Sequence, residues 1–568
     1  MDNPGWFGPP DRSLFGWLCT PQDGNAFLGV VICPPIGEEE HNAHETFRRL
    51  AWSLADHGIA SLRFDYHGTG DSLGRWSDPD RLDAWLTSVT DAVRSLKEAG
   101  ATAVVVVGMR VGATLAAVAA HQGRIEIDGL LLWDPVSGKG MLREGQARRP
   151  SVLEPPAGAV DTPGYLYSAP TAAELRSLDV ATLGPGPIAP QLLVVLREDR
   201  PAPRGLRKRL AGPDVEWAVT DEQPDLLDVP MTESAVPEKT LARVVDWLVA
   251  RSTGHPQKIS QVLTPTLTFR TDIGVRVSER VVALGSIGLF GILSEPEAVN
   301  RPVLVVMINV ANDRHTGPGR RWVDSSREWA NDGFRVLRMD QSGTGDSPTH
   351  EGQQFGTLYA REWLADLPDA LSCPMLQHSP LVLIGLCSGA YSAMEAAFYR
   401  PVVAVYAINV ILHARVTSRW STLADPRRIA ARPAGWAFQR TGDRWPRTAA
   451  LMWRIYRQVT VWNAPMAAVA ALVRQGTIVI LVMSPDDGRH FRESAFWSGL
   501  HAWRWRRSGR YALLESEQVD HPLMTQEGQT WAMRAIRGDL IRRFVAAPHE
   551  AHSSPADRRA VRKVLSEG

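Results

Sequence analysis

The most constraining feature of this chain is that it repeats its own motifs at a fixed spacing. Leu14-Phe-Gly-Trp-Leu18 returns as Leu289-Phe-Gly-Ile-Leu293, and Gly68-Thr-Gly-Asp-Ser72 returns as Gly343-Thr-Gly-Asp-Ser347. The offset is 275 residues in both cases (289 − 14 and 343 − 68). Different motifs that keep one register indicate two copies of one fold. The 568 residues are also too many for a single hydrophobic core.

Apolar strands alternate with helices in both copies, which predicts mostly parallel sheets that are buried on both faces. In the first copy we expect strands at 27–33, 60–64, 103–107, 129–133 and 191–196, and helices at 42–56, 83–99, 113–121 and 238–250. In the second copy we expect strands at 303–308, 334–339, 381–384, 402–409, 477–483 and 511–519, and helices at 321–332, 359–371, 491–506 and 526–546. The expected fold class is α/β, with two tandem domains, each a doubly wound sheet flanked by helices.

The expected domain boundaries follow from this repeat. Residues 1–252 form the first copy, 253–277 a linker, 278–547 the second copy and 548–568 a frayed tail. The second copy also carries a segment at 411–475 that is rich in Arg, Trp and Ala. We expect this segment to be mostly helical and long enough to form a lid over a site.

Composition excludes several functional classes. The 62 basic residues balance the 62 acidic ones, which argues against a nucleic-acid or anionic-membrane binder. The 4 cysteines show no C-x-x-C spacing, so we expect no disulfide scaffold, no metal site and a reducing, cytoplasmic location. The sequence shows neither a signal peptide nor an apolar run of membrane-spanning length. Nothing in it indicates a cofactor.

The stretch that carries the chemistry is Leu381-Val-Leu-Ile-Gly385-Leu-Cys387-Ser-Gly389. It predicts an apolar strand, a sharp turn and a helix, which is the context of a nucleophile elbow. Small residues are needed two positions either side of the nucleophile so that strand and helix can approach each other. The helix N-terminus then stabilises a nearby anion. Cys387 occupies the nucleophile position, although a small buried thiol would fit the same pattern.

Both copies resemble α/β-hydrolases of the serine-aminopeptidase and esterase-like branch over nearly their whole lengths. The resemblance rests on the two elbows, on the Gly-Thr-Gly-Asp-Ser turns, and on Arg63-Phe-Asp65 and Arg338-Met-Asp340 before those turns. Pro34-Pro-Ile-Gly-Glu38 is similar to exosortase-associated hydrolases. His315-Thr-Gly-Pro318, together with the Cys elbow, is similar to a related group with Cys at the elbow. The Asp and Ser of the turns are expected to be structural.

The fold that this resemblance implies places its acid and its histidine after the nucleophile, each at the end of a strand. The strand at 477–483 is followed by Asp486 and Asp487, of which we favour Asp487 as the acid, and the strand at 511–519 is followed by His521. His490 is a rival base, but it stands at the start of a helix. An Asp in a turn and a loop histidine without a partner are the alternatives. We predict the triad Cys387, Asp487 and His521.

This triad predicts covalent catalysis through a thioester acyl-enzyme. An imidazolium at His521 and the helix N-terminus would favour the thiolate of Cys387, and Asp487 would fix the tautomer of His521. Two backbone N–H groups would bind the oxyanion. We expect one from Ser388 and the other from Val310 or Ala311.

The first copy has an elbow without a nucleophile. Gly108-Met-Arg110-Val-Gly112 keeps both glycines, but a guanidinium cannot attack an ester. Asp199 is the candidate for a retained acid, yet no histidine occurs between His121 and His255. We therefore expect residues 1–252 to be catalytically inactive. Arg110 is either structural or a site for a carboxylate or phosphate ligand.

The predicted function is an acyl hydrolase or acyltransferase of the esterase or thioesterase type. Its substrate would be a small-molecule ester or thioester, including a CoA-linked acyl group or an acyl carrier protein. The basic stretches 204–209 and 501–507 would suit an acidic carrier, or are simply solvated helix faces. The alternatives are a catalytically inactive scaffold or carrier-binding module, and a condensing or polymerising acyltransferase.

Overall fold

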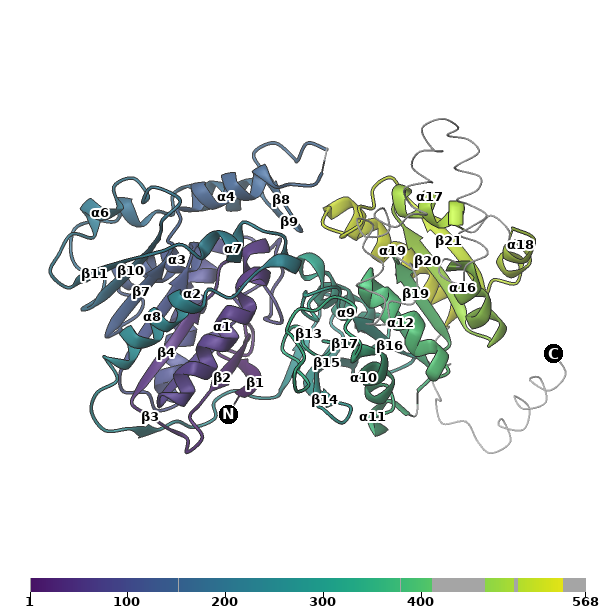
Figure 1. The fold of residues 1–568 in the computed structure, drawn as a ribbon, viewed down its shortest axis with the longest axis horizontal. Coiled ribbons are helices and arrows are strands. Elements are labelled where there is room, and N and C mark those ends of the chain that lie inside the picture. Colours follow the sequence, from purple (N-terminus) through teal and green to yellow (C-terminus); the bar gives the residue numbers. More distant parts are fainter. Residues whose placement is uncertain (1, 152, 378, 411–464, 495–498, 545–568) are drawn as a thin grey trace, which may run out of the picture.

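The computed structural model contains two large sheets, which lie side by side and are each built from a different part of the chain (Figure 1). It describes residues 2–151, 153–377, 379–410, 465–494 and 499–544. Most of the expected lid, residues 411–464, and the expected tail lie outside this part of the chain. No helix in the described part is long and apolar enough to cross a membrane.

The first sheet has eight strands, and all of its strand pairs are parallel except those at the edge that begins with β1. Strand β2 runs antiparallel to both of its neighbours, β1 and β5, and every later pair is parallel. The spatial order is β1 (Asp2–Phe7), β2 (Leu14–Cys19), β5 (Ile59–Phe64), β4 (Leu28–Cys33), β6 (Val104–Met109), β7 (Gly129–Trp133), β10 (Leu192–Arg197) and β11 (Val215–Thr220).

The second sheet has nine strands and repeats the order of the first after one additional edge strand. Its order is β13 (Thr266–Arg270), β14 (Arg276–Leu284), β15 (Leu289–Pro296), β17 (Arg335–Met339), β16 (Leu304–Ile308), β18 (Leu381–Leu386), β19 (Ala404–Ile408), β20 (Ile478–Met483) and β21 (Tyr511–Glu515). Pairs from β13 to β17 are antiparallel, and the others are parallel.

Helices cover both faces of each sheet, as the buried apolar strands require. On the first sheet, α1 (Glu38–Asp56) and α8 (Glu238–Val249) pack on one face, and α2 (Arg81–Glu98) and α3 (Val111–His121) on the other. On the second, α9 (Arg321–Asn331) and α19 (Gln526–Arg543) pack on one face, and α10 (Trp363–Ala370), α12 (Ser388–Tyr399) and α16 (Pro465–Arg474) on the other. The expected α/β class, with doubly wound sheets, is confirmed.

The remaining elements are short and lie around the sheets. They are the strand pairs β3 (Asn25–Ala26) with β12 (Gln257–Lys258) and β8 (Val160–Thr162) with β9 (Tyr165–Tyr167), and the helices α4 (Gly138–Ala147), α5 (Ala169–Arg176), α6 (Leu206–Arg209), α7 (Gln223–Leu227), α11 (Pro374–Gln377), α17 (Pro485–Ser494) and α18 (Gly499–Arg507).

Several elements differ from those expected. The antiparallel edge strands and β11 were not predicted; β11 is half-exposed along its length, so it lacks the continuous apolar run of a central strand. The helix expected at 359–371 begins only at Trp363, because Tyr359 has a left-handed φ of 53°. The helix expected at 491–506 is divided between α17 and α18. Within the expected linker 253–277, β12 pairs with the first copy and β13 with the second.

The two copies meet through the antiparallel edges of their sheets. Strand β1 lies beside β13, and Trp6 forms an antiparallel bridge with Thr264. In the apolar cluster between the sheets, the rings of Phe15 and Phe290 lie 6.4 Å apart, centroid to centroid. These two residues are equivalent in the repeat, since 290 − 15 is again 275. A residue that contacts its own equivalent lies on a two-fold axis.

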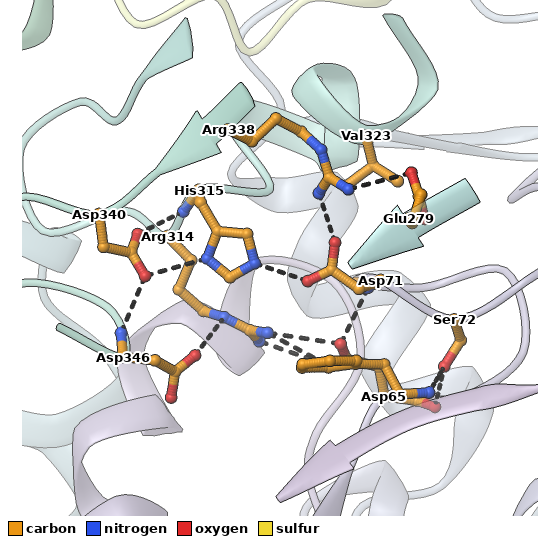
Figure 2. Close-up of polar contacts among 12 residues, drawn as sticks. Asp65, Asp71, Ser72, Glu279, Arg314, His315, Val323, Arg338, Asp340 and Asp346 are labelled. Atoms are coloured by element: carbon orange, nitrogen blue, oxygen red, sulfur yellow. Dashed lines mark hydrogen bonds and ion pairs between the residues drawn. The ribbon is translucent and has the colours of Figure 1, made fainter. Parts of the chain in front are cut away.

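Polar contacts across the boundary follow the same symmetry, beginning with Asp71 of the first Gly-Thr-Gly-Asp-Ser turn (Figure 2). Asp71 accepts hydrogen bonds from Arg338 and from His315, whose Nε2 lies 2.6 Å from Asp71 Oδ2. The other ring nitrogen of His315, Nδ1, lies 2.9 Å from Asp340 Oδ2. All four side chains are fully buried. Such charges are tolerated in the interior only when they are paired.

The equivalent aspartate of the second turn, Asp346, is bound in the same way by the first copy. His44 Nε2 lies 3.1 Å from Asp346 Oδ1, and Arg63, the equivalent of Arg338, lies 3.5 Å from the same oxygen. Arg48 donates to the carbonyls of Gly345 and Ser347, and Arg320 donates to those of Gly70 and Ser72. The boundary is therefore a pseudo-two-fold interface of the kind seen in symmetric dimers.

Candidate active site

Cys387 lies on a sharp turn between strand β18 and helix α12. Its φ of 51° and ψ of −111° are unfavourable for a residue with a side chain. The flanking glycines are required sterically, because a Cβ at Gly385 would lie 2.3 Å from the Gly389 carbonyl carbon and one at Gly389 would lie 2.3 Å from the Asn309 oxygen. The thiol is free and partly exposed at the N-terminus of α12. This is the elbow that the sequence predicts.

The predicted acid and base meet beside this thiol. His521 Nδ1 lies 2.8 Å from Asp487 Oδ2. Hydrogen bonds with Asp487 and Cys387 raise the pKa of His521 to about 10. His521 therefore lies between the carboxylate and the sulfur, the position that the base of a triad requires. The structure brings Cys387, Asp487 and His521 together.

The rival residues lie elsewhere. Asp486 points outward: its side chain is 89% exposed and pairs with Arg489. His490 is on helix α17 with Asp487, and it is His521 that bonds to Asp487. Burial alone would raise the pKa of Asp487, but the hydrogen bonds from His521 and Ser484 lower it, so the carboxylate is charged.

Asn409, which sequence reasoning missed, holds the acid loop and the histidine loop together. It follows strand β19 with a φ of 45° and is fully buried. Its Nδ2 donates to the carbonyls of Asp520 and His521, both at 2.9 Å, and its Oδ1 accepts the N–H of Ser484 at 2.7 Å. An Asn at the end of a buried strand was the available signal, because Asn tolerates left-handed backbone.

The predicted oxyanion donors lie around the elbow, but one of them is occupied. The N–H of Ser388 belongs to the first turn of α12 and has no intrahelical acceptor. Val310 and Ala311 follow strand β16 and contact the apolar cluster that includes Cys387. However, the N–H of Ala311 donates to Ser388 Oγ at 2.8 Å. Ala311 is therefore not free to bind an oxyanion in this arrangement.

A second residue that was not predicted, Tyr359, also reaches the sulfur. Its hydroxyl lies 3.7 Å from Cys387 Sγ, and its ring meets Tyr391 edge-on with centroids 5.5 Å apart. The sequence assigned Tyr359 to a helix, so its approach to the elbow could not be anticipated.

The loop that carries Val310 and Ala311 is anchored on the first copy. Asp313 lies 2.8 Å from His41, Arg314 bonds to Glu40 at 2.5 Å, and His315 and Arg320 make the contacts described above. Further along, Gly164 in the turn between β8 and β9 donates to the Met524 carbonyl at 2.8 Å, three residues after His521. The first copy thus supports two loops of the candidate site in the second.

The strand order identifies the fold, and comparison with known proteins agrees with it. A family model described as serine aminopeptidase, S33, matches residues 30–149, which belong to the first copy. The chain has the α/β-hydrolase fold. No curated protein matches the chain.

Three similar solved structures each cover less than half of this chain. Est1E from Butyrivibrio proteoclasticus with bound ferulic acid is 18% identical, with a TM-score of 0.34, over 43% of this chain and 96% of that one. The Pyrococcus furiosus esterase Pf2001 is 19% identical, with a TM-score of 0.32, over 45% and 92%. Mouse alpha/beta hydrolase domain-containing protein 10 is 17% identical, with a TM-score of 0.32, over 44% and 100%.

The elbow of the first copy has the same backbone conformation as that of the second, but it carries an arginine in place of the cysteine. Arg110 has a φ of 55° and a ψ of −123°, close to the values of Cys387. Its buried guanidinium is bound by Glu39 and Asp134, each at 3.0 Å, and by Glu144. Burial raises the pKa of Asp134 to about 6, although Arg110 favours its charged form. Because the guanidinium of Arg110 is already paired with carboxylates of the same copy, a structural role for Arg110 is favoured over the binding of an anionic ligand.

The expected acid of the first copy, Asp199, is paired with an arginine instead of a histidine. Asp199 bonds to Arg197 at 2.8 Å, and its side chain is 40% exposed.

Replacing Arg110 by methionine should destabilise the protein without changing the reactivity of Cys387. Removal of the guanidinium leaves Glu39 and Asp134 buried with only distant arginines, Arg148 at 3.8 Å and Arg197 at 4.0 Å, for which we expect a loss of about 3–5 kcal/mol in the free energy of unfolding. Denaturant unfolding measures this loss. Arg124→Met, at an exposed ion pair with Asp83, is the matched control and should change little. A stable Arg110→Met variant with altered Cys387 labelling would instead indicate a ligand site.

One group of described residues has the spacing of metal ligands, namely His315, Asp340 and Asp346. Both ring nitrogens of His315 are already bonded to Asp71 and Asp340, and Asp346 is paired with His44. The group is used in the interface between the copies.

The basic stretches are partly engaged in packing. In α6, Arg207 stacks on Trp217, and Arg209 donates to the Leu183 carbonyl. In α18, Arg506 lies over Tyr511 and Arg507 over Trp503. These contacts favour the interpretation as solvated faces that cover aromatic rings.

Proposed function

We propose that this protein is an acyl hydrolase or acyltransferase that forms a thioester on Cys387. The observation that carries the proposal is the convergence of Cys387, His521 and Asp487 at the end of one sheet, with His521 Nδ1 2.8 Å from the acid and the sulfur close enough to raise the pKa of His521. A nucleophile, a base and an orienting carboxylate in this order are the requirements of covalent acyl transfer.

The roles of the three side chains follow from their contacts. His521 holds the proton released by the thiol and later protonates the leaving group. Asp487 accepts from Nδ1, which leaves Nε2 directed at the sulfur and stabilises the imidazolium. The acyl group is then carried as a thioester, which transfers to water, an alcohol, an amine or another thiol. The substrate class we propose is a small ester or thioester, including CoA-linked or carrier-bound acyl groups.

An acyl adduct on Cys387 is the direct test of this function. Incubation with 4-nitrophenyl acetate and with a panel of acyl thioesters should add one acyl group to the intact mass, and peptide mapping should place it on Cys387. The matched control is Cys373→Ala, which removes another partly exposed thiol, one whose sulfur accepts the Gly285 N–H. That variant should still be acylated, whereas Cys387→Ala should not.

A catalytically inactive scaffold would give the opposite result. If iodoacetamide labels Cys387 no faster than Cys373 at neutral pH, and no acyl adduct forms, the protein is a scaffold in which Cys387 is only a small residue of the elbow.

A further inference from the structure

One of the two backbone N–H groups expected after strand β16 to bind the oxyanion, that of Ala311, is already engaged. Ser388 offers its N–H from the first turn of α12. The N–H of Ala311 is instead bonded to Ser388 Oγ at 2.8 Å, and Ser388 is buried, so this bond is shielded from water. A buried N–H that already has an acceptor gives little additional stabilisation to an anion.

Tyr359 places a hydroxyl donor beside the sulfur. Its oxygen lies 3.7 Å from Cys387 Sγ, so a carbonyl carbon bonded to that sulfur would hold its oxygen within reach of the phenol. Burial raises the pKa of Tyr359 above its ordinary value of 10, which keeps the hydroxyl protonated and able to donate. The backbone conformation of Tyr359 and the packing of its ring both hold its hydroxyl beside Cys387 Sγ.

The backbone of Tyr359 is in the left-handed region, with a φ of 53°, which is rare and strained for an aromatic residue. The ring packs edge-on against Tyr391, one helical turn after the nucleophile. Strain of this kind persists only where the surrounding structure imposes it, and it is concentrated at functional sites.

We propose that the hydroxyl of Tyr359 is the second donor to the oxyanion formed at Cys387. This inference rests on the proposed function. In the acylation step the thiolate attacks the carbonyl carbon, a C–S bond forms, and the π electrons move to the oxygen. Tyr359 and the Ser388 N–H then donate to that oxygen without transferring a proton. When the carbonyl re-forms, the leaving group departs and takes its proton from His521.

Two reagents that differ in one respect test this role. Acylation by 4-nitrophenyl acetate passes through an oxyanion, whereas alkylation by iodoacetamide is a displacement at a saturated carbon and forms none. In Tyr359→Phe we expect acylation of Cys387 to slow by about 10²–10³-fold, as on loss of one oxyanion donor. The rate of alkylation should stay unchanged. The affinity for 1,1,1-trifluoroacetone, which forms a thiohemiketal at the thiol, should fall in parallel.

The control is Tyr406→Phe, which removes a buried hydroxyl that donates to Asp539 at 2.9 Å on another part of the sheet. It should leave both rates unchanged. Equal losses of acylation and alkylation in Tyr359→Phe would show that Tyr359 only positions the thiol, and an unchanged acylation rate would exclude it as a donor. Absence of any acyl adduct in the unsubstituted protein would instead overturn the proposed function itself.

Discussion

Replacing His521 by alanine will slow acylation of Cys387 by about 10²–10⁴-fold, the usual contribution of a general base. His521 bonds to Asp487, and the neighbouring Cys387 helps to raise its pKa. Without it the thiol loses its proton acceptor and the leaving group loses its proton donor. The rate of adduct formation from 4-nitrophenyl acetate, followed by intact mass, measures the loss. Alkylation of Cys387 by iodoacetamide should slow as well, because the neighbouring group that accepts the thiol proton is gone.

Two neighbouring carboxylates provide a matched pair for the same site. Asp487→Asn should reproduce most of the loss, since an amide leaves His521 in the wrong tautomer. Asp486→Asn should have no effect, because Asp486 is exposed and pairs with Arg489. If the two variants behave alike, the acid of the triad has been assigned to the wrong residue.

Replacing Asp71 by asparagine will destabilise the interface between the copies by about 3–5 kcal/mol, the usual cost of breaking a buried ion pair. Asp71 is fully buried and is bonded to Arg338 and His315. Each cation would then keep only one buried carboxylate, Asp340 for His315 and Glu279 for Arg338. Denaturant unfolding measures the change. Asp83→Asn, in an exposed pair with Arg124, is the control and should change little. A loss no larger than that of the control would contradict the interpretation of the cluster as a structural centre.

The same interface should weaken at alkaline pH. Burial alone would lower the pKa of His315, but Asp71 and Asp340 raise it to about 10; Asp313 likewise outweighs burial and raises that of His41 to about 9. A raised pKa gives stability that is fully present below the ordinary value of 6.5 and is lost as the pH rises through the folded value. The free energy of unfolding should therefore fall between about pH 6.5 and 10. His315→Gln should flatten this slope, and an equal slope in that variant would assign the effect to other groups.

Acid should have little effect on Asp71 itself. Burial alone would raise its pKa, but His315 and Arg338 hold it well below its ordinary value of 3.8, so its contribution is lost only in strong acid.

The features that could be predicted are those that depend on order along the chain. The 275-residue repeat, the glycines around Cys387 and Arg110, and the places of Asp487 and His521 after their strands are properties of local sequence. Strand ends converge on one edge of a parallel sheet, so residues at those ends meet without further information.

The features that could not be predicted depend on side chains from distant elements. Tyr359 reaches Cys387 only because its backbone leaves the helical region, and Asn409 contacts two loops about 75 and 111 residues later in the chain. The N–H of Ala311, which the fold alone would assign to the oxyanion, is bonded to Ser388 Oγ instead. Such choices are decided by tertiary packing, which local propensity does not encode.

The pseudo-two-fold boundary explains why a copy without a nucleophile is still part of the molecule. Two separate subunits related in this way would dissociate on dilution, whereas a peptide connection fixes their effective concentration at a high value regardless of how much protein is present. Once joined, only one half needs chemistry. The other can exchange its nucleophile for a buried arginine, provided that it continues to hold the loop of His315 and the turn beside Met524 in place. The first copy is, in this sense, a permanently bound support for the loops of the candidate site, which the second never has to recruit.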